Sequence, residues 1–236
     1  MKIILSAIAV SLAVGMLFLS SVAMNADEYW EQRVSLFDTL PISGNDIVFL
    51  GNSITDGGEF AEYFKNPDVK NRGIRSDVID GVRKRLDQVT KGRPAKIFLL
   101  IGINDVSHHL GTACIADKYR TLVREIRSKS PETKLYIQSV MPINNTFRRY
   151  KNLIGTEGTI RDLNTCLRRI AQEEGAEYVD LTDALSDSKG CLRREFTNDG
   201  LHLTGKGYAA WAEVIAPLVG EPRVSIDIVR PEKRDR

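Results

Sequence analysis

Short apolar runs of strand length recur along the chain, and longer stretches with helical spacing separate them. Two runs are apolar almost throughout, "NDIVFLG" (45–51) and "KIFLLIG" (96–102). Three weaker runs follow at similar intervals: "VKNRGI" (69–74), "KLYIQSV" (134–140) and "AEYVDL" (176–181). Continuous apolar runs are typical of parallel strands that are covered on both faces. We therefore expect five strands in a mainly parallel sheet.

The segments between these runs carry apolar residues at the spacing of amphipathic helices. One predicted helix spans 76–92, with Ser76 as its N-cap. Further helices are expected near 115–129 and 160–174, and a last one after Thr204. Strands that alternate with helices predict a single α/β domain, in which helices cover both faces of the sheet.

The first residues follow a different pattern. A short positive start at Met1–Lys2 precedes an uncharged apolar run, and small residues then lead into the acidic "DEY". This order is typical of a secretory signal peptide over 1–26, with cleavage after Ala23 or Ala26. The run is also long enough for an uncleaved membrane anchor. We expect an exported protein, periplasmic or extracellular in a bacterium, with no stable membrane insertion once the signal is removed.

The rest of the chain divides into one domain over 27–220 and a charged tail over 221–236, in which "RVSIDIV" is a candidate edge strand. Hydrophobic residues make up 42% and charged residues 27%, with a net charge of +2, so nothing indicates a nucleic-acid partner. The three cysteines fit no metal motif, and we expect no metal site. Cys114 and Cys166 lie in helix-like segments, where we expect them to be small buried residues.

Polar residues follow three of the predicted strands, where an open parallel sheet binds its ligands. Ser53 comes directly after the first strand, and it is either a nucleophile or the cap of the next helix. A serine nucleophile needs a base and a group that orients the base. The chain has only three histidines, and Asp199 lies three positions before one of them, His202. We predict that Ser53, His202 and Asp199 form a catalytic triad.

A tetrahedral acyl intermediate also needs fixed hydrogen-bond donors for its oxyanion. The candidates are the backbone N–H of Ser53, the backbone N–H of Gly73 and the side-chain amide of Asn104. Gly73 suits the role because it has no Cβ to obstruct a substrate. Taken singly, Gly73 fits a plain turn and Asn104 a loop-capping amide.

These segments together resemble a known family. "GNSIT" after a strand, Gly73 after "NR", "GIND" after "LLI", and "DGLHL" near the C-terminus are similar to the four blocks of the SGNH (GDSL-type) hydrolases. The resemblance implies a three-layer, flavodoxin-like fold and ester hydrolysis by the predicted triad, without a cofactor. Within the family the sequence is most similar to the group of the platelet-activating-factor acetylhydrolase catalytic subunit. Exported bacterial members of that type are often associated with deacetylating sugars.

Two positions depart from the family pattern. Asn52 replaces the usual aspartate of the first block, where we expect it to hold the loop by hydrogen bonds. Arg75 stands where a further glycine is common, and we hypothesise that it favours an acidic acyl sugar such as an O-acetylated sialic acid or uronate; a solvent-exposed arginine is the alternative. Asp56 and His108 are weaker candidates for substrate binding, since a first-turn acid and a loop histidine explain them equally well.

The sequence therefore predicts an exported serine esterase that removes a short acyl group, such as acetyl, from a carbohydrate or other small ester. The loop "MPINNTFRRYKNLIG" (141–155) is the candidate substrate lid. Three alternatives remain open: a lysophospholipase or thioesterase for long acyl chains, an O-acyltransferase that uses the same site, and a catalytically silent carbohydrate-binding module.

Overall fold

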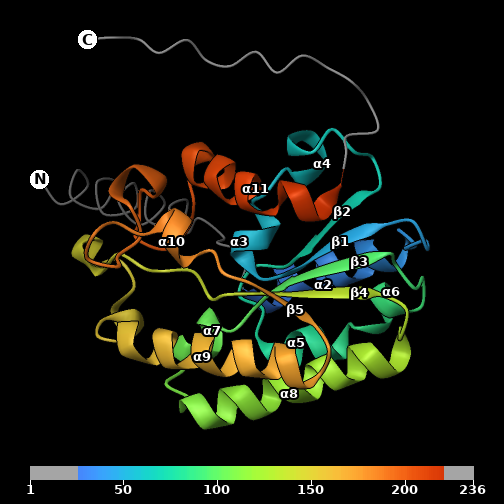
Figure 1. The fold of residues 1–236 in the computed structure, drawn as a ribbon, viewed down its shortest axis with the longest axis horizontal. Coiled ribbons are helices and arrows are strands. Elements are labelled where there is room, and N and C mark those ends of the chain that lie inside the picture. Colours follow the sequence, from blue (N-terminus) through green and yellow to red (C-terminus); the bar gives the residue numbers. More distant parts are fainter. Residues whose placement is uncertain (1–25, 221–236) are drawn as a thin grey trace, which may run out of the picture.

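Five parallel strands form one sheet in the order β2-β1-β3-β4-β5, as Figure 1 shows. The strands are β1 (Ile47–Gly51), β2 (Val69–Gly73), β3 (Lys96–Leu100), β4 (Lys134–Gln138) and β5 (Glu177–Val179). The computed structural model describes residues 26–220. The predicted five-stranded parallel sheet is confirmed. The apolar run at the N-terminus and the candidate edge strand in the tail lie outside the described residues.

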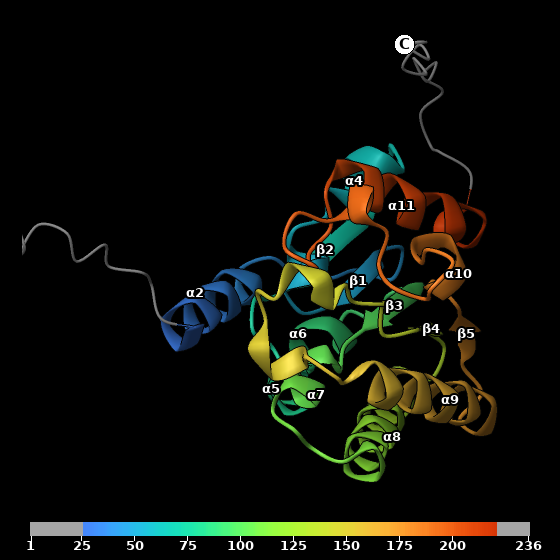
Figure 2. The ribbon, with the colours of Figure 1, turned by 90° about the vertical axis from the view of Figure 1, so that its left-hand side faces the viewer.

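Ten α-helices connect and flank these strands in the described part of the chain. They are α2 (Ala26–Asp38), α3 (Ser53–Asp56), α4 (Phe60–Tyr63), α5 (Ile79–Lys84), α6 (Asp87–Thr90), α7 (Ile103–Ser107), α8 (Thr112–Lys129), α9 (Glu157–Glu173), α10 (Thr182–Leu185) and α11 (Gly205–Val219). Helices α4 and α11 lie on one side of the sheet, and α5, α8 and α9 lie on the other (Figures 1 and 2). The three-layer arrangement is therefore as expected. No helix among residues 26–220 combines the length and apolar content needed to cross a bilayer.

An aromatic row across neighbouring strands forms part of the core. Phe49, Phe98 and Tyr136 are register partners on β1, β3 and β4, and their rings stack with centroids 4.9 and 4.5 Å apart. Trp211 of α11 packs edge-on against Phe49 and against Phe60 of α4. These side chains are almost completely buried, so α11 is held firmly on the sheet. The loop that precedes α11 is thereby fixed at the carboxyl edge of the strands.

The helix predicted over 76–92 is interrupted in the structure. Ser76 has φ 61°, in the left-handed region, so it is not the N-cap; that position belongs to Val78. The helix that follows ends at Lys84, and α6 begins only at Asp87. Between them Arg85 turns its side chain into the interior toward Asp77, which gives the interruption its physical reason.

The prediction of two buried cysteines was wrong. Cys114 is exposed and Cys166 is partly exposed. The buried stripe of α8 runs through Ile115, Ala116 and Tyr119, so Cys114 falls on the opposite face. All three cysteines are free thiols in the described chain.

Candidate active site

Ser53 lies where strand β1 meets a short helix. It is the first residue of α3, and Asn52 is the N-cap, whose Oδ1 accepts a hydrogen bond of 3.1 Å from the Ile54 N–H. Asn52, and not Ser53, is therefore the cap of this helix, and Asn52 holds the loop by a hydrogen bond as expected. The first residues of a helix leave their N–H groups without intrahelical partners. The Ser53 hydroxyl thus stands beside donors that a ligand can use.

His202 approaches Ser53 from the loop before α11. The Ser53 Oγ lies 2.9 Å from His202 Nε2, and His202 Nδ1 lies 2.8 Å from Asp199 Oδ2. The three residues that the sequence predicts as a triad are thus joined by two hydrogen bonds, although Ser53 and His202 are 149 positions apart. This is the order of contacts that activates a serine: hydroxyl to imidazole, and imidazole to carboxylate.

The Asp199 carboxylate is held on both oxygens. Its Oδ1 accepts backbone hydrogen bonds from Leu201 (2.9 Å) and His202 (2.8 Å), so the tight loop itself orients the carboxylate. Burial raises the pKa of Asp199, but the hydrogen bonds from His202, the backbone and Tyr150 outweigh it and lower the pKa to about 2. The carboxylate therefore stays ionised and can stabilise a positive charge on His202.

Tyr150 is a fourth member of this cluster. Its hydroxyl donates to Asp199 Oδ2 at 2.8 Å and lies 3.0 Å from His202 Nδ1. Burial and the contact with Asp199 raise the pKa of Tyr150 to about 12, so the phenol keeps its proton. The sequence pointed only to a polar loop with an aromatic residue here; no local signal tied Tyr150 to a residue 49 positions away.

Asn104, in the first turn of the short helix α7 that follows β3, lines the same cavity as Ser53 and His202. Its Nδ2 donates to the Asp77 carbonyl at 2.8 Å, which fixes the amide and leaves its second N–H for a ligand. Asp105, the next residue, is buried and accepts a hydrogen bond from the N–H of Ile79, so it anchors the start of α5. The neighbouring loops are therefore pinned to each other around Asn104.

The structure does not bring Gly73 to the cavity, which corrects its assignment as an oxyanion donor. Its N–H already donates to Asn71 Oδ1 at 2.8 Å, and a Cβ at this position would lie 2.1 Å from the Asp56 nitrogen. Gly73 is required for close packing of β2 against α3. Ser76, three residues later, lines the cavity instead, and its N–H makes no hydrogen bond within the described chain.

A cavity of about 810 Å³ opens over this cluster. It is lined by Ser53, Gly57, Arg75, Ser76, Asn104, Ser107, Arg149, Tyr150, Lys151, Asn152, Leu153, Leu201, His202, Leu203 and Tyr208. Polar and apolar surface both line the cavity, and the apolar side chains are three leucines and two tyrosine rings. Part of the predicted lid, residues 149–153, forms one wall of the cavity.

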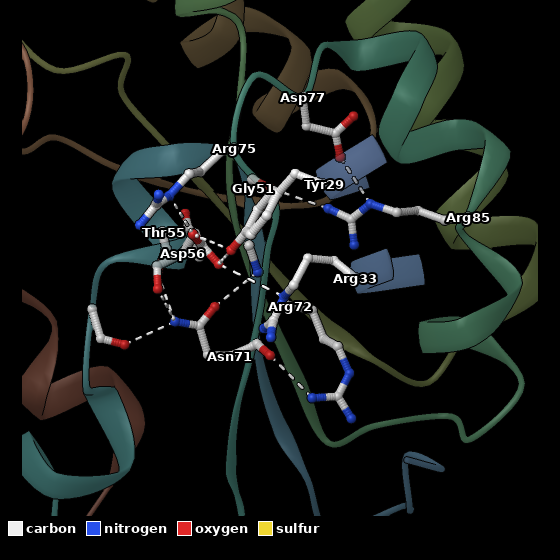
Figure 3. Close-up of polar contacts among 12 residues, drawn as sticks. Tyr29, Arg33, Gly51, Thr55, Asp56, Asn71, Arg72, Arg75, Asp77 and Arg85 are labelled. Carbon is white, nitrogen blue, oxygen red and sulfur yellow. Dashed lines mark hydrogen bonds and ion pairs between the residues drawn. The ribbon is translucent and has the colours of Figure 1, made fainter. Parts of the chain in front are cut away.

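The three predicted substrate-binding residues have different positions. Arg75 lines the cavity and its side chain is 67% exposed. Asp56 lies behind it, 7% exposed, and accepts hydrogen bonds from the Arg75 Nε and the Tyr29 hydroxyl (Figure 3). His108 is exposed and lies outside the cavity lining, because α7 ends at Ser107 and turns away.

A buried ion pair supports the loop that carries Ser76. Arg85 Nε donates to Asp77 Oδ2 at 2.8 Å, Arg85 Nη2 donates to the Gly51 carbonyl, and both side chains are at most 1% exposed (Figure 3). Trp30 of α2 adds a hydrogen bond to Asp77 Oδ1. Helix α2, which the sequence did not predict, thus contacts the loop from outside. Among residues 26–220, no group of three acidic, histidine or cysteine side chains could hold a metal ion.

Comparison with known proteins indicates the family of this chain. The model of the GDSL-like lipase/acylhydrolase family matches residues 49–210. A Streptococcus pneumonia protein described as a platelet activating factor is 25% identical, with a TM-score of 0.74 over 91% of this chain and 99% of its own. A variant of Axe2, an acetyl-xylooligosaccharide esterase from Geobacillus, is 20% identical, with a TM-score of 0.61 over 78% of this chain and 98% of its own.

A longer protein shares part of its sequence with this chain. The N-acylneuraminate cytidylyltransferase of Escherichia coli O18:K1:H7 is 33% identical over 189 residues, which are 75% of this chain and 41% of that protein. The chain thus spans less than half of that relative. The family match covers β1, the carboxyl edge of the sheet and the loop that carries His202. The chain therefore belongs to the GDSL-like lipase/acylhydrolase family.

Proposed function

We propose that this acylhydrolase is an exported serine esterase that removes short acyl groups, acetyl above all, from a carbohydrate. The observation that carries the proposal is the continuous set of contacts from Ser53 Oγ through His202 to Asp199, at 2.9 and 2.8 Å. Ser53 and His202 line a cavity large enough for a sugar ester. The N-terminal signal pattern supports export.

The reaction follows from these contacts. Ser53 Oγ attacks the ester carbonyl carbon while His202 Nε2 accepts its proton, and the carbonyl π electrons move to the oxygen. The intermediate collapses to an acyl-enzyme, and His202 gives the proton to the departing alcohol. Water then attacks the acyl-enzyme with His202 as base, which releases the carboxylic acid and restores Ser53. Asp199 holds His202 with Nδ1–H toward the carboxylate and Nε2 toward the serine.

Three hydrogen-bond donors are available for the oxyanion in this mechanism. They are the N–H of Ser53, the N–H of Ser76 and the Nδ2 of Asn104, all from residues that line the cavity. Neither of the two backbone N–H groups donates a hydrogen bond within the described chain, and Asn104 uses only one of its two amide hydrogens. Donors fixed before the reaction stabilise the transition state without reorganisation.

The cavity favours a short acyl group over a long one. Its apolar surface comes from three leucines, two tyrosine rings and the carbon atoms of polar side chains, whereas a long acyl chain would need an extended groove lined by apolar residues. The names of two relatives support a carbohydrate substrate: one is an acetyl-xylooligosaccharide esterase, and the other is named for N-acylneuraminate, a sugar. A series of p-nitrophenyl esters from acetate to palmitate should show the highest kcat/KM at the short end.

The decisive experiment is the Ser53→Ala variant with p-nitrophenyl acetate. We expect turnover to fall by at least about 10³-fold with an unchanged circular dichroism spectrum. Ser35→Ala, at an exposed position on α2, is the matched control and should keep full activity. Retained turnover by Ser53→Ala would refute the mechanism. An added glycan acceptor that captures the acetyl group in preference to water would instead identify an acyltransferase.

A further inference from the structure

Among residues 26–220, three cationic side chains and no carboxylate line the cavity that contains Ser53 and His202. Arg75 comes from the loop after β2, and Arg149 and Lys151 come from the loop after β4. We infer that these three residues form an anion subsite, so that the substrate is an acyl ester of a sugar that bears a carboxylate. This inference rests on the proposed esterase function and names the substrate class of the same site.

Arg75 is held in place for such a contact. Its Nε donates to Asp56 Oδ2 at 3.1 Å, and its guanidinium lies 5.3 Å from the centre of the Tyr29 ring (Figure 3). The Tyr29 hydroxyl in turn donates to Asp56 at 2.9 Å. The two terminal nitrogens of Arg75 make no hydrogen bond within the described chain. A guanidinium fixed at Nε presents its remaining N–H groups in a planar fork that fits a carboxylate.

The carboxylate behind Arg75 does not cancel the positive charge. Asp56 also lies 3.9 Å from the Arg33 Nε, so two guanidinium groups share a single carboxylate. The Asp56 side chain is 7% exposed, whereas that of Arg75 is 67% exposed. The negative charge is therefore withdrawn from the cavity, and the positive charge of Arg75 faces it.

Arg149 and Lys151 provide the second side of the subsite. Both are exposed, and neither forms an ion pair with a carboxylate among residues 26–220. The residue between them, Tyr150, contacts Asp199, so the backbone of this segment is fixed next to His202. An ester whose carbonyl reaches Ser53 would therefore place its substituents between Arg75 on one side and the two loop cations on the other.

A neutral acetylated sugar gains nothing from these charges, because water solvates them equally well. A sugar acid gains an ion pair with each cation it reaches, and an exposed pair contributes up to about fivefold in a binding constant. Several positive charges around a concave site also attract an anion from solution and raise its association rate, and salt weakens this effect. The preference for the acid should therefore be largest at low ionic strength.

The test compares two substrates that differ in one charge: O-acetylated methyl glucuronoside and the corresponding O-acetylated glucuronamide. We expect kcat/KM of the wild-type enzyme to be at least about tenfold higher for the acid than for the amide. This ratio should fall as NaCl rises to about 0.5 M, which screens exposed ion pairs. Arg75→Ala should reduce the ratio about fivefold through the acid alone. The double substitution Arg149→Ala and Lys151→Ala should reduce it further. Arg169→Ala, at a position with similar exposure on α9, is the control.

Equal turnover of acid and amide by the wild-type enzyme would overturn the inference, as would an unchanged ratio in both cation variants. A faster reaction with an O-acetylated 6-sulfated glucoside than with the glucuronoside would overturn the assignment of a carboxylate. These outcomes are distinct from failure of the proposed function, because the glucuronamide reports Ser53-dependent hydrolysis without any charge. Its hydrolysis by Ser53→Ala would refute the function, whatever the ratio.

Discussion

The buried pair of Asp77 and Arg85 allows a quantitative test of how the site is supported. Both side chains are at most 1% exposed, and Arg85 Nε donates to Asp77 Oδ2 at 2.8 Å. Substitution of Arg85 by Met keeps most of the volume but removes the only cation that contacts this carboxylate within the described chain. Breaking a buried pair on one side costs about 3–5 kcal/mol, because the remaining charge is buried without compensation. We expect the free energy of unfolding of Arg85→Met to fall by this amount.

The loss should depend on pH in a definite direction. Burial raises the pKa of Asp77, and Arg85 is the strongest influence that opposes this rise. Without Arg85 the folded-state pKa rises further above the unfolded value, which is about 3.9. A group of this kind destabilises the folded protein above its folded pKa, and the penalty disappears as the pH falls to the unfolded value. The difference between wild type and variant should therefore be smaller at pH 4.5 than at pH 7.

Urea unfolding followed by tryptophan fluorescence at both pH values measures these differences. A second variant, Asp77→Asn with Arg85→Met, replaces the charge by a neutral amide that can keep the hydrogen bond from Trp30. We expect it to be more stable than Arg85→Met alone at pH 7. If the double variant is less stable than the single one, or if the loss is the same at both pH values, the uncompensated charge is not the cause.

Three further predictions concern the same loops. Ser76→Pro removes a backbone N–H and cannot adopt φ 61°, so kcat for p-nitrophenyl acetate should fall by about 10²–10³. Ser76→Gly should keep activity and change stability by no more than about 1 kcal/mol. Equal losses of kcat in the two variants would exclude a role for the N–H. Trp30→Phe loses the hydrogen bond to Asp77, and thermal unfolding should show a loss of about 1–2 kcal/mol. Asp199 has a pKa of about 2, below its usual value, so it stabilises the fold above about pH 4 and loses this contribution as the pH falls toward 2. Urea unfolding between pH 6 and 3 should therefore show a shallower acid decline for Asp199→Asn than for wild type, and identical slopes would contradict the linkage.

The strands and the candidate triad were predictable because their signals are local or strongly constrained. Apolar runs such as 96–102 identify covered parallel strands, and the sheet then brings their carboxyl ends to one edge. With only three histidines in the chain and an aspartate three positions before His202, few arrangements could place a base near Ser53. Distance along the chain was no obstacle, since the parallel topology provides the juxtaposition.

The oxyanion donor was misassigned for a physical reason that the sequence partly contains. Gly73 is the only glycine in its segment, and glycine is the usual residue for close approach or a left-handed turn. The structure puts the left-handed residue at Ser76 instead. Asn71 was the available signal, because an asparagine side chain commonly accepts a hydrogen bond from the N–H two residues later.

Helix α2 escaped prediction because its contacts are mostly polar. Only Phe37 is buried along its length, so the helix lacks the apolar stripe that reveals an amphipathic helix. Tyr29 and Trp30 instead reach Asp56 and Asp77 through a hydroxyl and an indole N–H. Contacts of this kind depend on tertiary geometry, and no spacing in the sequence encodes them.

Tyr150 has a consequence for anyone who wishes to redesign this enzyme. Its hydroxyl donates a hydrogen bond to the Asp199 carboxylate, while its immediate neighbours Arg149 and Lys151 line the cavity. Substrate choice and the orientation of the base therefore share one short piece of backbone. A library that replaced the whole loop would change both properties at once and lose most of its members to inactivity. Holding Tyr150 constant as a pivot and varying only the positions on either side would separate the two.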